Sequence, residues 1–395
     1  MPSAGKPLVL YFKVLIAAAC FMAGGFILPV PVAHAETLKT SAPMAYLFEP
    51  ESKTILFAKE ADKPFEPGSL AKVMTAATVF AALSEGEIFP HTKCRISEHA
   101  WRTGGAPAGG TTMFAAIKSE IEVLDLLQGL IVQNGNDSAI ALAECLDGSE
   151  AKFAERMTAL ARQIGMTGSR FANPTGYESE VSQTTVRDMV RLADYILEHH
   201  RAYYPMFSQP DFTWNKIFQR NKDPLLGEIR GQDGLGAGQS EKDGYAALAS
   251  VERDGRRVIA AVAGLPSDKA RLAAAKEVIE GSWEYFGISK LYSRGETITN
   301  ARVFGGTRSD VPLVASEDVS VLLPRGTTLD YRLRVVYSGP LKAPVSAGTA
   351  AGELRVIGEN GIVYRAPLET GAAVPEGNMQ EKALDGLMEL LFGWL

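Results

Sequence analysis

Apolar residues along the chain follow two spacings, one typical of strands and one typical of helices. Short apolar runs on either side of a polar turn predict β-hairpins within 44–57 and again within 245–264. Between them, apolar residues recur with a helical period at 70–83, 123–146 and 184–199, and a threonine is expected to cap the last helix. Central helices with hairpins at both ends predict an α+β fold, in which helices pack on an antiparallel sheet.

The composition of the chain changes near Lys290. From 290 to 375, short alternating runs separated by glycine and proline predict a small all-β domain. The last stretch, 376–395, has the spacing of an amphipathic helix. Its apolar face is formed by Leu384, Leu387, Met388, Leu391 and Leu395. We therefore expect a first domain at 36–289, a second at 290–375 and a terminal helix at 376–395.

The first 35 residues have the features of a secretory signal peptide. Lys6 and Lys13 give a basic start, 14–27 is almost wholly apolar, and the small residues at 33–35 form a cleavage site. The alternative is an uncleaved membrane anchor. We expect removal of 1–35 and export of the remaining chain.

Composition and charge exclude several classes of function. With 46% hydrophobic and 22% charged residues, the 395-residue chain should bury a sizeable core. A net charge of −6 argues against nucleic acid as a partner. The five histidines are scattered and no phosphate-binding loop is present, so neither a metal nor a cofactor is expected. Cys94 and Cys145 remain after export, but their spacing alone does not show whether they pair.

The stretch EPGSLAKVMTA, residues 66–76, carries the first candidate chemistry. Ser69 and Lys72 are three residues apart at the start of a predicted helix, so they are neighbours on one face. The positive end of a helix favours a serine oxyanion, and a lysine acts as a base once burial makes it neutral. The spacing by itself also fits a capping serine beside a solvated lysine.

The surrounding sequence resembles the low-molecular-mass penicillin-binding proteins, the D-alanyl-D-alanine carboxypeptidases of bacterial cell-wall metabolism. Residues 67–72, PGSLAK, resemble the Ser-x-x-Lys motif of this superfamily. Other stretches resemble the family in the same order, namely 101–105, 110–114, 129–144, 171–176, 233–235, 303–306 and 337–341. The resemblance implies a penicillin-binding, β-lactamase-like transpeptidase domain, then a small all-β domain and a membrane-associated amphipathic helix.

The resemblance also implies a mechanism. Ser69 would attack the carbonyl between the two terminal D-alanines of a peptidoglycan stem peptide and form an acyl-enzyme, with Lys72 as its base. The backbone N–H of Ser69 and one from a later strand would form the oxyanion hole. Penicillins and other β-lactams mimic this dipeptide and are expected inhibitors. The helix at 376–395 would hold the periplasmic protein on the inner-membrane surface, unless it packs on the protein itself.

Two motifs of the family are altered in this chain. The Ser-x-Asn motif reads Asn134-Gly135-Asn136, so an amide replaces the hydroxyl that relays a proton, while Asn136 remains to hold the substrate amide.

The Lys-Thr-Gly motif, which binds substrate, reads Gly236-Ala237-Gly238. A cation and a hydroxyl for the substrate's terminal carboxylate are therefore missing. Gly238 is retained, which would let the backbone approach a ligand. Lys242 is expected to lie past the strand end and not to take over.

Three functions remain open on these residues. The first is a working serine carboxypeptidase, the second a weakened or inactive homologue that binds cell-wall peptide or partner proteins, and the third a β-lactamase-like hydrolase. The leader, the β domain and the terminal helix favour the first two. The intact Ser69–Lys72 pair favours acylation, so we predict carboxypeptidase activity.

Overall fold

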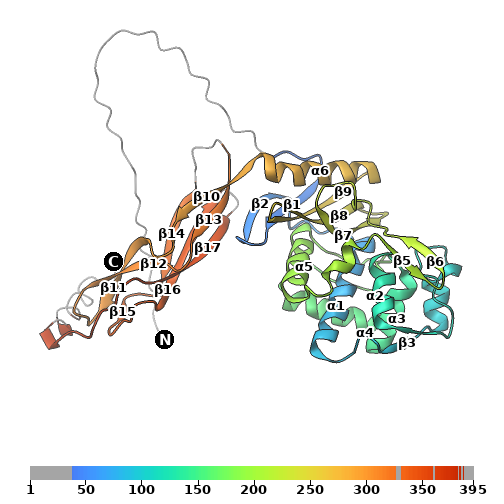
Figure 1. Cartoon of the computed structure of the whole chain (residues 1–395), viewed down its shortest axis with the longest axis horizontal. Helices are drawn as coiled ribbons and strands as arrows, with labels where there is room; N and C mark the ends of the chain where they lie inside the picture. Colours follow the sequence, from blue (N-terminus) through green and yellow to red (C-terminus); the bar gives the residue numbers. More distant parts are fainter. Residues whose placement is uncertain (1–37, 326–330, 359–360, 381, 384–385, 387–395) are drawn as a thin grey trace, which may run out of the picture. The chain divides into compact units, whose positions relative to one another are not determined.

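The centre of the first structural unit is a five-stranded antiparallel sheet with the strand order β2-β1-β9-β8-β7 (Figure 1). Both predicted hairpins are confirmed. The strands are β1 (Met44–Glu49), β2 (Thr54–Lys59), β7 (Gln232–Ser240), β8 (Gly244–Arg253) and β9 (Arg256–Leu265). The two hairpins are far apart in the sequence, and β1 joins them by pairing with β9, with Tyr46 opposite Ala261.

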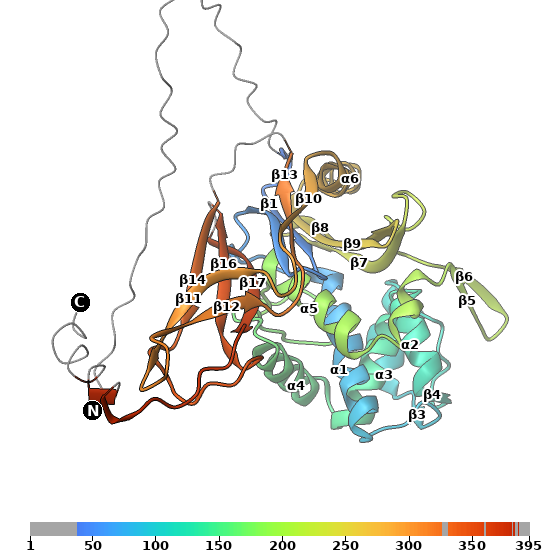
Figure 2. The same cartoon turned by 60° about the vertical axis from the view of Figure 1, so that its left-hand side comes forward.

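Helices cover both faces of this sheet, which explains why β8 and β9 are apolar along most of their length. One face packs against α6 (Asp268–Glu284) and the other against the helices that include α1 and α5, as both views show (Figures 1 and 2). Those helices are α1 (Ala71–Glu85), α2 (Val123–Ile131), α3 (Asn136–Asp147), α4 (Glu150–Gln163) and α5 (Val186–His199). The Thr185 side chain accepts a hydrogen bond from the Asp188 N–H, so the expected threonine cap of α5 is confirmed.

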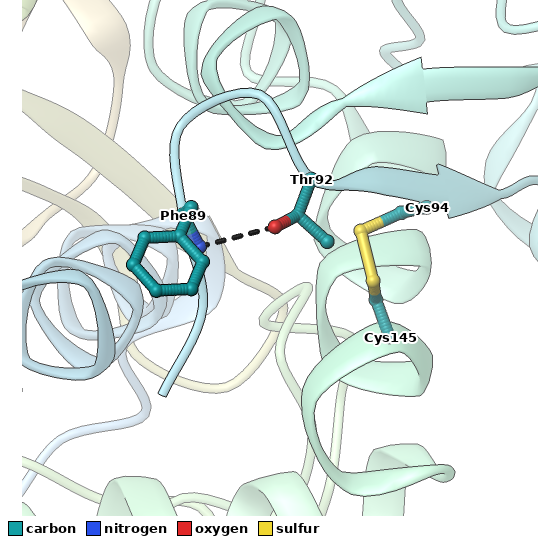
Figure 3. The surroundings of a disulfide bond; sticks show 4 residues. All are labelled: Phe89, Thr92, Cys94 and Cys145. Atoms are coloured by element: carbon teal, nitrogen blue, oxygen red, sulfur yellow. Dashed lines mark hydrogen bonds between the residues drawn. A yellow bond between two sulfur atoms is a disulfide. The ribbon is translucent and has the colours of Figure 1, made fainter. Parts of the chain in front are cut away.

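Shorter elements complete the first unit. They are η1 (Gly68–Leu70), η2 (Ala100–Gly104), η3 (Ala106–Ala108), η4 (Tyr204–Ser208) and the strand pairs β3 (Lys93–Arg95) with β4 (Glu120–Glu122) and β5 (Asp211–Trp214) with β6 (Ile217–Arg220). A disulfide joins Cys94 on β3 to Cys145 on α3, with the two Cα atoms 5.5 Å apart (Figure 3). The pairing that the sequence left open is therefore present, and it fixes the β3 segment to the helical core.

Between residues 290 and 375, the second unit is all-β, as predicted. Its six-stranded sheet has the order β14-β16-β17-β12-β11-β15. The strands are β11 (Thr297–Phe304), β12 (Asp310–Ala315), β14 (Arg332–Tyr337), β15 (Leu341–Lys342), β16 (Ala350–Gly358) and β17 (Gly361–Thr370), while β10 (Phe286–Tyr292) pairs with β13 (Val319–Pro324) in a separate ladder. Within the six-stranded sheet, the pairs are antiparallel except for β11 with β15. An α+β region followed by an all-β region confirms the expected fold class.

The computed structural model describes residues 38–325, 331–358, 361–380, 382–383 and 386. The chain divides into two compact units, one made of the described residues up to 287 with 322–325, and the other of the remaining described residues. The predicted leader at 1–35 and most of the predicted helix at 376–395 lie outside the described residues. Within the described ranges, no helix combines the length and the hydropathy required to cross a bilayer.

Candidate active site

The segment that carries Ser69 packs tightly against strand β7. Ser69 is the central residue of η1, which runs directly into α1. Gly68 has φ +52, and a Cβ added to it would lie 2.1 Å from the Gln239 carbonyl oxygen. A Cβ at Gly238 would lie 2.2 Å from the Pro67 carbonyl oxygen. Gly238 therefore accommodates the serine turn, which differs from the expected role of admitting a ligand.

A groove, partly open to solvent, lies beside Ser69; the empty space in it is about 400 Å³ when the adjoining open solvent is included. It is lined by Ser69, Lys72, Val73, Leu130, Ile131, Asn134, Phe207, Lys222, Asp223, Leu235, Gly236 and Ala237. The structure therefore brings together residues from all three motif regions, which are far apart in the sequence. Asn136 and Gly238 do not line the groove and are buried instead. A hydrolase of this type needs a groove beside its nucleophile, and Ser69 and Lys72 both line this one.

The Lys72 side chain is in an environment suited to a base. Only 5% of Lys72 is exposed, and its burial lowers the pKa to about 7 despite the opposing attraction of Asp137. Asp137 does not depend on Lys72 for hydrogen bonds, because it accepts them from the backbone N–H groups of Met113, Ala115 and Ser138 at 3.0 Å each. A large share of Lys72 is therefore neutral near pH 7 and able to accept a proton.

The second motif region forms a tight turn in which asparagine is well suited to position 134. Asn134 has φ +57, a conformation that asparagine tolerates better than most residues. Its carbonyl oxygen accepts a hydrogen bond from the Thr111 hydroxyl at 2.6 Å, and the Asn136 N–H donates to the Thr111 carbonyl at 2.9 Å. The hydroxyl of Tyr177 donates to the Thr103 carbonyl at 2.5 Å, and its side chain also bonds to that of Asn136. The turn is thus fixed from two sides.

Strand β7 has a backbone that favours glycine where the family has lysine. Gly236 has φ +155, a value that residues with a Cβ rarely adopt, although the nearest atom to an added Cβ is 4.0 Å away on Val73. Position 236 therefore has space for a side chain but a backbone suited to glycine. Lys242 is in the turn after β7 and lines a different hollow with Glu66 and Glu178. As expected, it does not replace the missing lysine in the groove.

The sequence analysis missed several residues of the groove, including the ionisable residues Lys222 and Asp223. The Lys222 N–H donates to the Val132 carbonyl at 2.8 Å. The Asp223 carboxylate accepts hydrogen bonds from the Leu225 N–H at 3.0 Å and from the Gln232 side chain at 2.7 Å. The signal in the sequence was only an Asn-Lys-Asp-Pro turn shortly before the third motif region, which marks a loop but no chemistry.

The described residues contain no group of three or more His, Cys, Asp or Glu side chains that could hold a metal ion. The groove itself brings together a serine, a buried lysine and the backbone of strand β7.

Comparison with protein families gives two matches that together span most of the chain. The model for D-alanyl-D-alanine carboxypeptidase matches residues 31–267, and the model for the penicillin-binding protein 5, C-terminal domain matches residues 286–376.

Comparison with individual proteins agrees with these models. The D-alanyl-D-alanine carboxypeptidase DacA of Haemophilus influenzae is 30% identical over 88% of this chain and 87% of its own length. The D-alanyl-D-alanine carboxypeptidase DacC of Escherichia coli is 29% identical over 92% of this chain and 93% of its own length. The crystal structure of penicillin-binding protein 5 from Haemophilus influenzae has a TM-score of 0.74 at 29% identity, covering 87% of this chain and all of that one. Penicillin-binding protein D2 from Listeria monocytogenes, in its ampicillin-bound form, has a TM-score of 0.55 at 26% identity and covers 62% of this chain and 98% of its own.

Proposed function

The chain belongs to the D-alanyl-D-alanine carboxypeptidase family, and from this premise we propose that it is a serine carboxypeptidase acting on peptidoglycan stem peptides. The observation that carries the proposal is the buried Lys72, with its pKa lowered to about 7, in the same groove as Ser69. A capping serine beside a solvated lysine, the alternative open on the sequence, does not fit a lysine that is only 5% exposed.

The proposed reaction begins with neutral Lys72. Its amine takes the proton of the Ser69 hydroxyl while the Ser69 oxygen attacks the carbonyl carbon between the two D-alanines. The N–H groups of Ser69 and of strand β7 stabilise the negative oxygen that forms. The bond to terminal D-alanine then breaks, its nitrogen receives the proton from Lys72, and water hydrolyses the acyl-enzyme.

The altered motifs support a second candidate, a homologue whose turnover is weakened or lost. Losing one partner of a desolvated charge pair costs about 2–5 kcal/mol, which is roughly 30- to several-thousand-fold in rate. Asn134 adds a further defect, because an amide cannot pass a proton to the leaving nitrogen as a hydroxyl can. These effects belong to one catalytic unit and are not summed. Such a protein would still bind cell-wall peptide.

The proposal includes the cellular setting. The basic and apolar start of the chain supports cleavage after residue 35 and a periplasmic location. The two family matches support mature domains at 36–289 and 290–375. The spacing of leucines within 376–395 supports a helix on the inner-membrane surface. β-Lactams are the proposed inhibitors, supported by the ampicillin-bound relative.

The test is release of D-alanine from a stem pentapeptide by the wild type and by Ser69→Ala. The proposal expects release that depends on Ser69. A covalent acyl-enzyme that persists on Ser69, with one D-alanine released per protein and no further turnover, supports the weakened homologue. Release that is equal in the two proteins contradicts both.

A further inference from the structure

We propose that Lys222 provides the positive charge that recognises the free terminal carboxylate of the substrate. The inference rests on the proposed function, because that carboxylate belongs to a peptide ending in D-Ala-D-Ala. In this chain the third motif has no lysine and no threonine, so the β7 residues that line the groove, Leu235, Gly236 and Ala237, offer that carboxylate only backbone groups. A cation from another segment is therefore needed for a strong preference for the free acid.

The position of Lys222 follows from two attachments of its loop. The Lys222 N–H donates to the Val132 carbonyl, just before the turn that carries Asn134. The next residue, Asp223, accepts a hydrogen bond from the Gln232 side chain, which also donates to the Gly234 carbonyl at 3.0 Å. The loop is thus tied to the second motif region on one side and to the start of β7 on the other.

These attachments place Lys222 on the wall of the substrate groove. It lines the groove together with Ser69, Gly236 and Ala237, and the residue is exposed, so water surrounds its side chain in the free protein. A bound peptide would cover it and displace this water, which strengthens an ion pair with a carboxylate.

Other cations near β7 are committed elsewhere. Lys72 has to be neutral to act as the base. Arg271 donates to the Gly238 carbonyl at 3.3 Å, pairs with Asp268 and does not line the groove. Lys242 lines a separate hollow. Among the described groove residues only Lys72 and Lys222 are basic, and no ion pair to Lys222 is found in the described part of the chain.

The neighbouring Asp223 competes little for this charge. Its carboxyl group is already engaged with the Leu225 N–H and the Gln232 side chain. Burial also raises the pKa of Asp223, which disfavours its negative form. Asp223 therefore competes only weakly with a substrate carboxylate for an ion pair with Lys222.

The experiment measures binding apart from acylation, in a Ser69→Ala background. The probes are diacetyl-L-Lys-D-Ala-D-Ala and the same peptide with a C-terminal amide, and their affinities are compared by titration calorimetry. We expect the Ser69→Ala protein to bind the peptide acid about tenfold more tightly than the peptide amide. Adding Lys222→Met should remove this preference, and Lys222→Arg should keep most of it. The matched control, Lys242→Met, removes a lysine outside the groove and should keep it fully.

The inference is overturned if the Ser69→Ala protein binds the acid and the amide equally well. It is also overturned if the preference for the acid remains after Lys222→Met is added. The melting temperature of each variant shows that the loop still folds. The proposed function fails separately, if the protein with Ser69 intact forms no acyl-enzyme while the preference for the acid still depends on Lys222. If acylation depends on Ser69 but the preference for the acid over the amide does not change with Lys222→Met, only the inference about Lys222 fails.

Discussion

Replacing Lys72 with methionine is expected to abolish acylation and, at neutral pH, to make the folded protein more stable. Lys72 is buried, and its surroundings lower its pKa from 10.5 to about 7. Folding therefore removes from water an amine that the unfolded chain keeps charged and solvated. Methionine has a similar length and no charge, so it fills the same space without this cost.

The size of the effect follows from the change in pKa. Each pKa unit corresponds to about 1.4 kcal/mol, so the difference between 10.5 and about 7 limits the gain at pH 7 to about 4 kcal/mol. The attraction between Lys72 and Asp137 is already part of this change in pKa, and contacts of the neutral amine that methionine does not make reduce the gain. Asp137 is not left unpaired, because its hydrogen bonds from Met113, Ala115 and Ser138 remain. We expect a net gain of roughly 2 to 4 kcal/mol in the free energy of unfolding.

The gain should depend on pH in a defined direction. Between about pH 7 and pH 10.5, the unfolded chain keeps a proton on Lys72 that the folded chain has released. The unfolded state thus binds more protons, so raising the pH stabilises the wild type by about 1.4 kcal/mol per pH unit in this window. The methionine variant has no such group. The difference in stability between the two proteins should therefore shrink as the pH rises.

Urea unfolding followed by tryptophan fluorescence measures this difference at about pH 7.5, 8.5 and 9.5. Trp101, Trp214 and Trp283 are in the same structural unit as Lys72, so the signal reports on its unfolding. The exposed Lys242 gives a matched control, since Lys242→Met should leave the curve unchanged. The reasoning is refuted by a Lys72→Met protein that is less stable than the wild type at pH 7.5, or by a difference that does not change with pH.

Three further outcomes are expected. The acylation rate should rise about tenfold per pH unit below pH 7 and level off above it, because only neutral Lys72 is a base; an inflection near pH 10 in a stopped-flow assay with a chromogenic β-lactam would contradict this. Gly238→Ala should lower both acylation and melting temperature, since its Cβ would collide with the serine turn, whereas Gly255→Ala has open space and should cost only about 1 kcal/mol of backbone strain. Cys145→Ser should lower the free energy of unfolding by about 2–5 kcal/mol by removing the bond to Cys94, and a reductant should then have no further effect on its urea midpoint.

Local patterns in the sequence were sufficient for the elements of the fold. The apolar period at 70–83 predicted α1, the two strand-turn-strand patterns predicted the hairpins, and a threonine cap marked the start of α5. These features depend on neighbours in the chain, which spacing and turn residues describe directly. The pairing of Ser69 with Lys72 was predicted in the same way, from a spacing of three residues, and both residues line the groove.

The rest of the site depends on contacts between distant segments, which spacing does not describe. Gly238 is required by the carbonyl of Pro67, more than 150 residues earlier in the chain. Lys222 is in a loop without periodicity and reaches the groove only because its loop is tied to the second motif region and to β7. The pairing of Cys94 with Cys145 likewise became evident only from the distance between their Cα atoms.

The most direct test of the central claim is the intact mass of the protein after incubation with benzylpenicillin. If Lys72 activates Ser69 in an accessible groove, the wild type should gain the mass of one penicilloyl group, and digestion should place it on the peptide that contains Ser69. Ser69→Ala should gain no mass. A wild type that remains unmodified, or an adduct that forms equally on Ser69→Ala, would contradict the account.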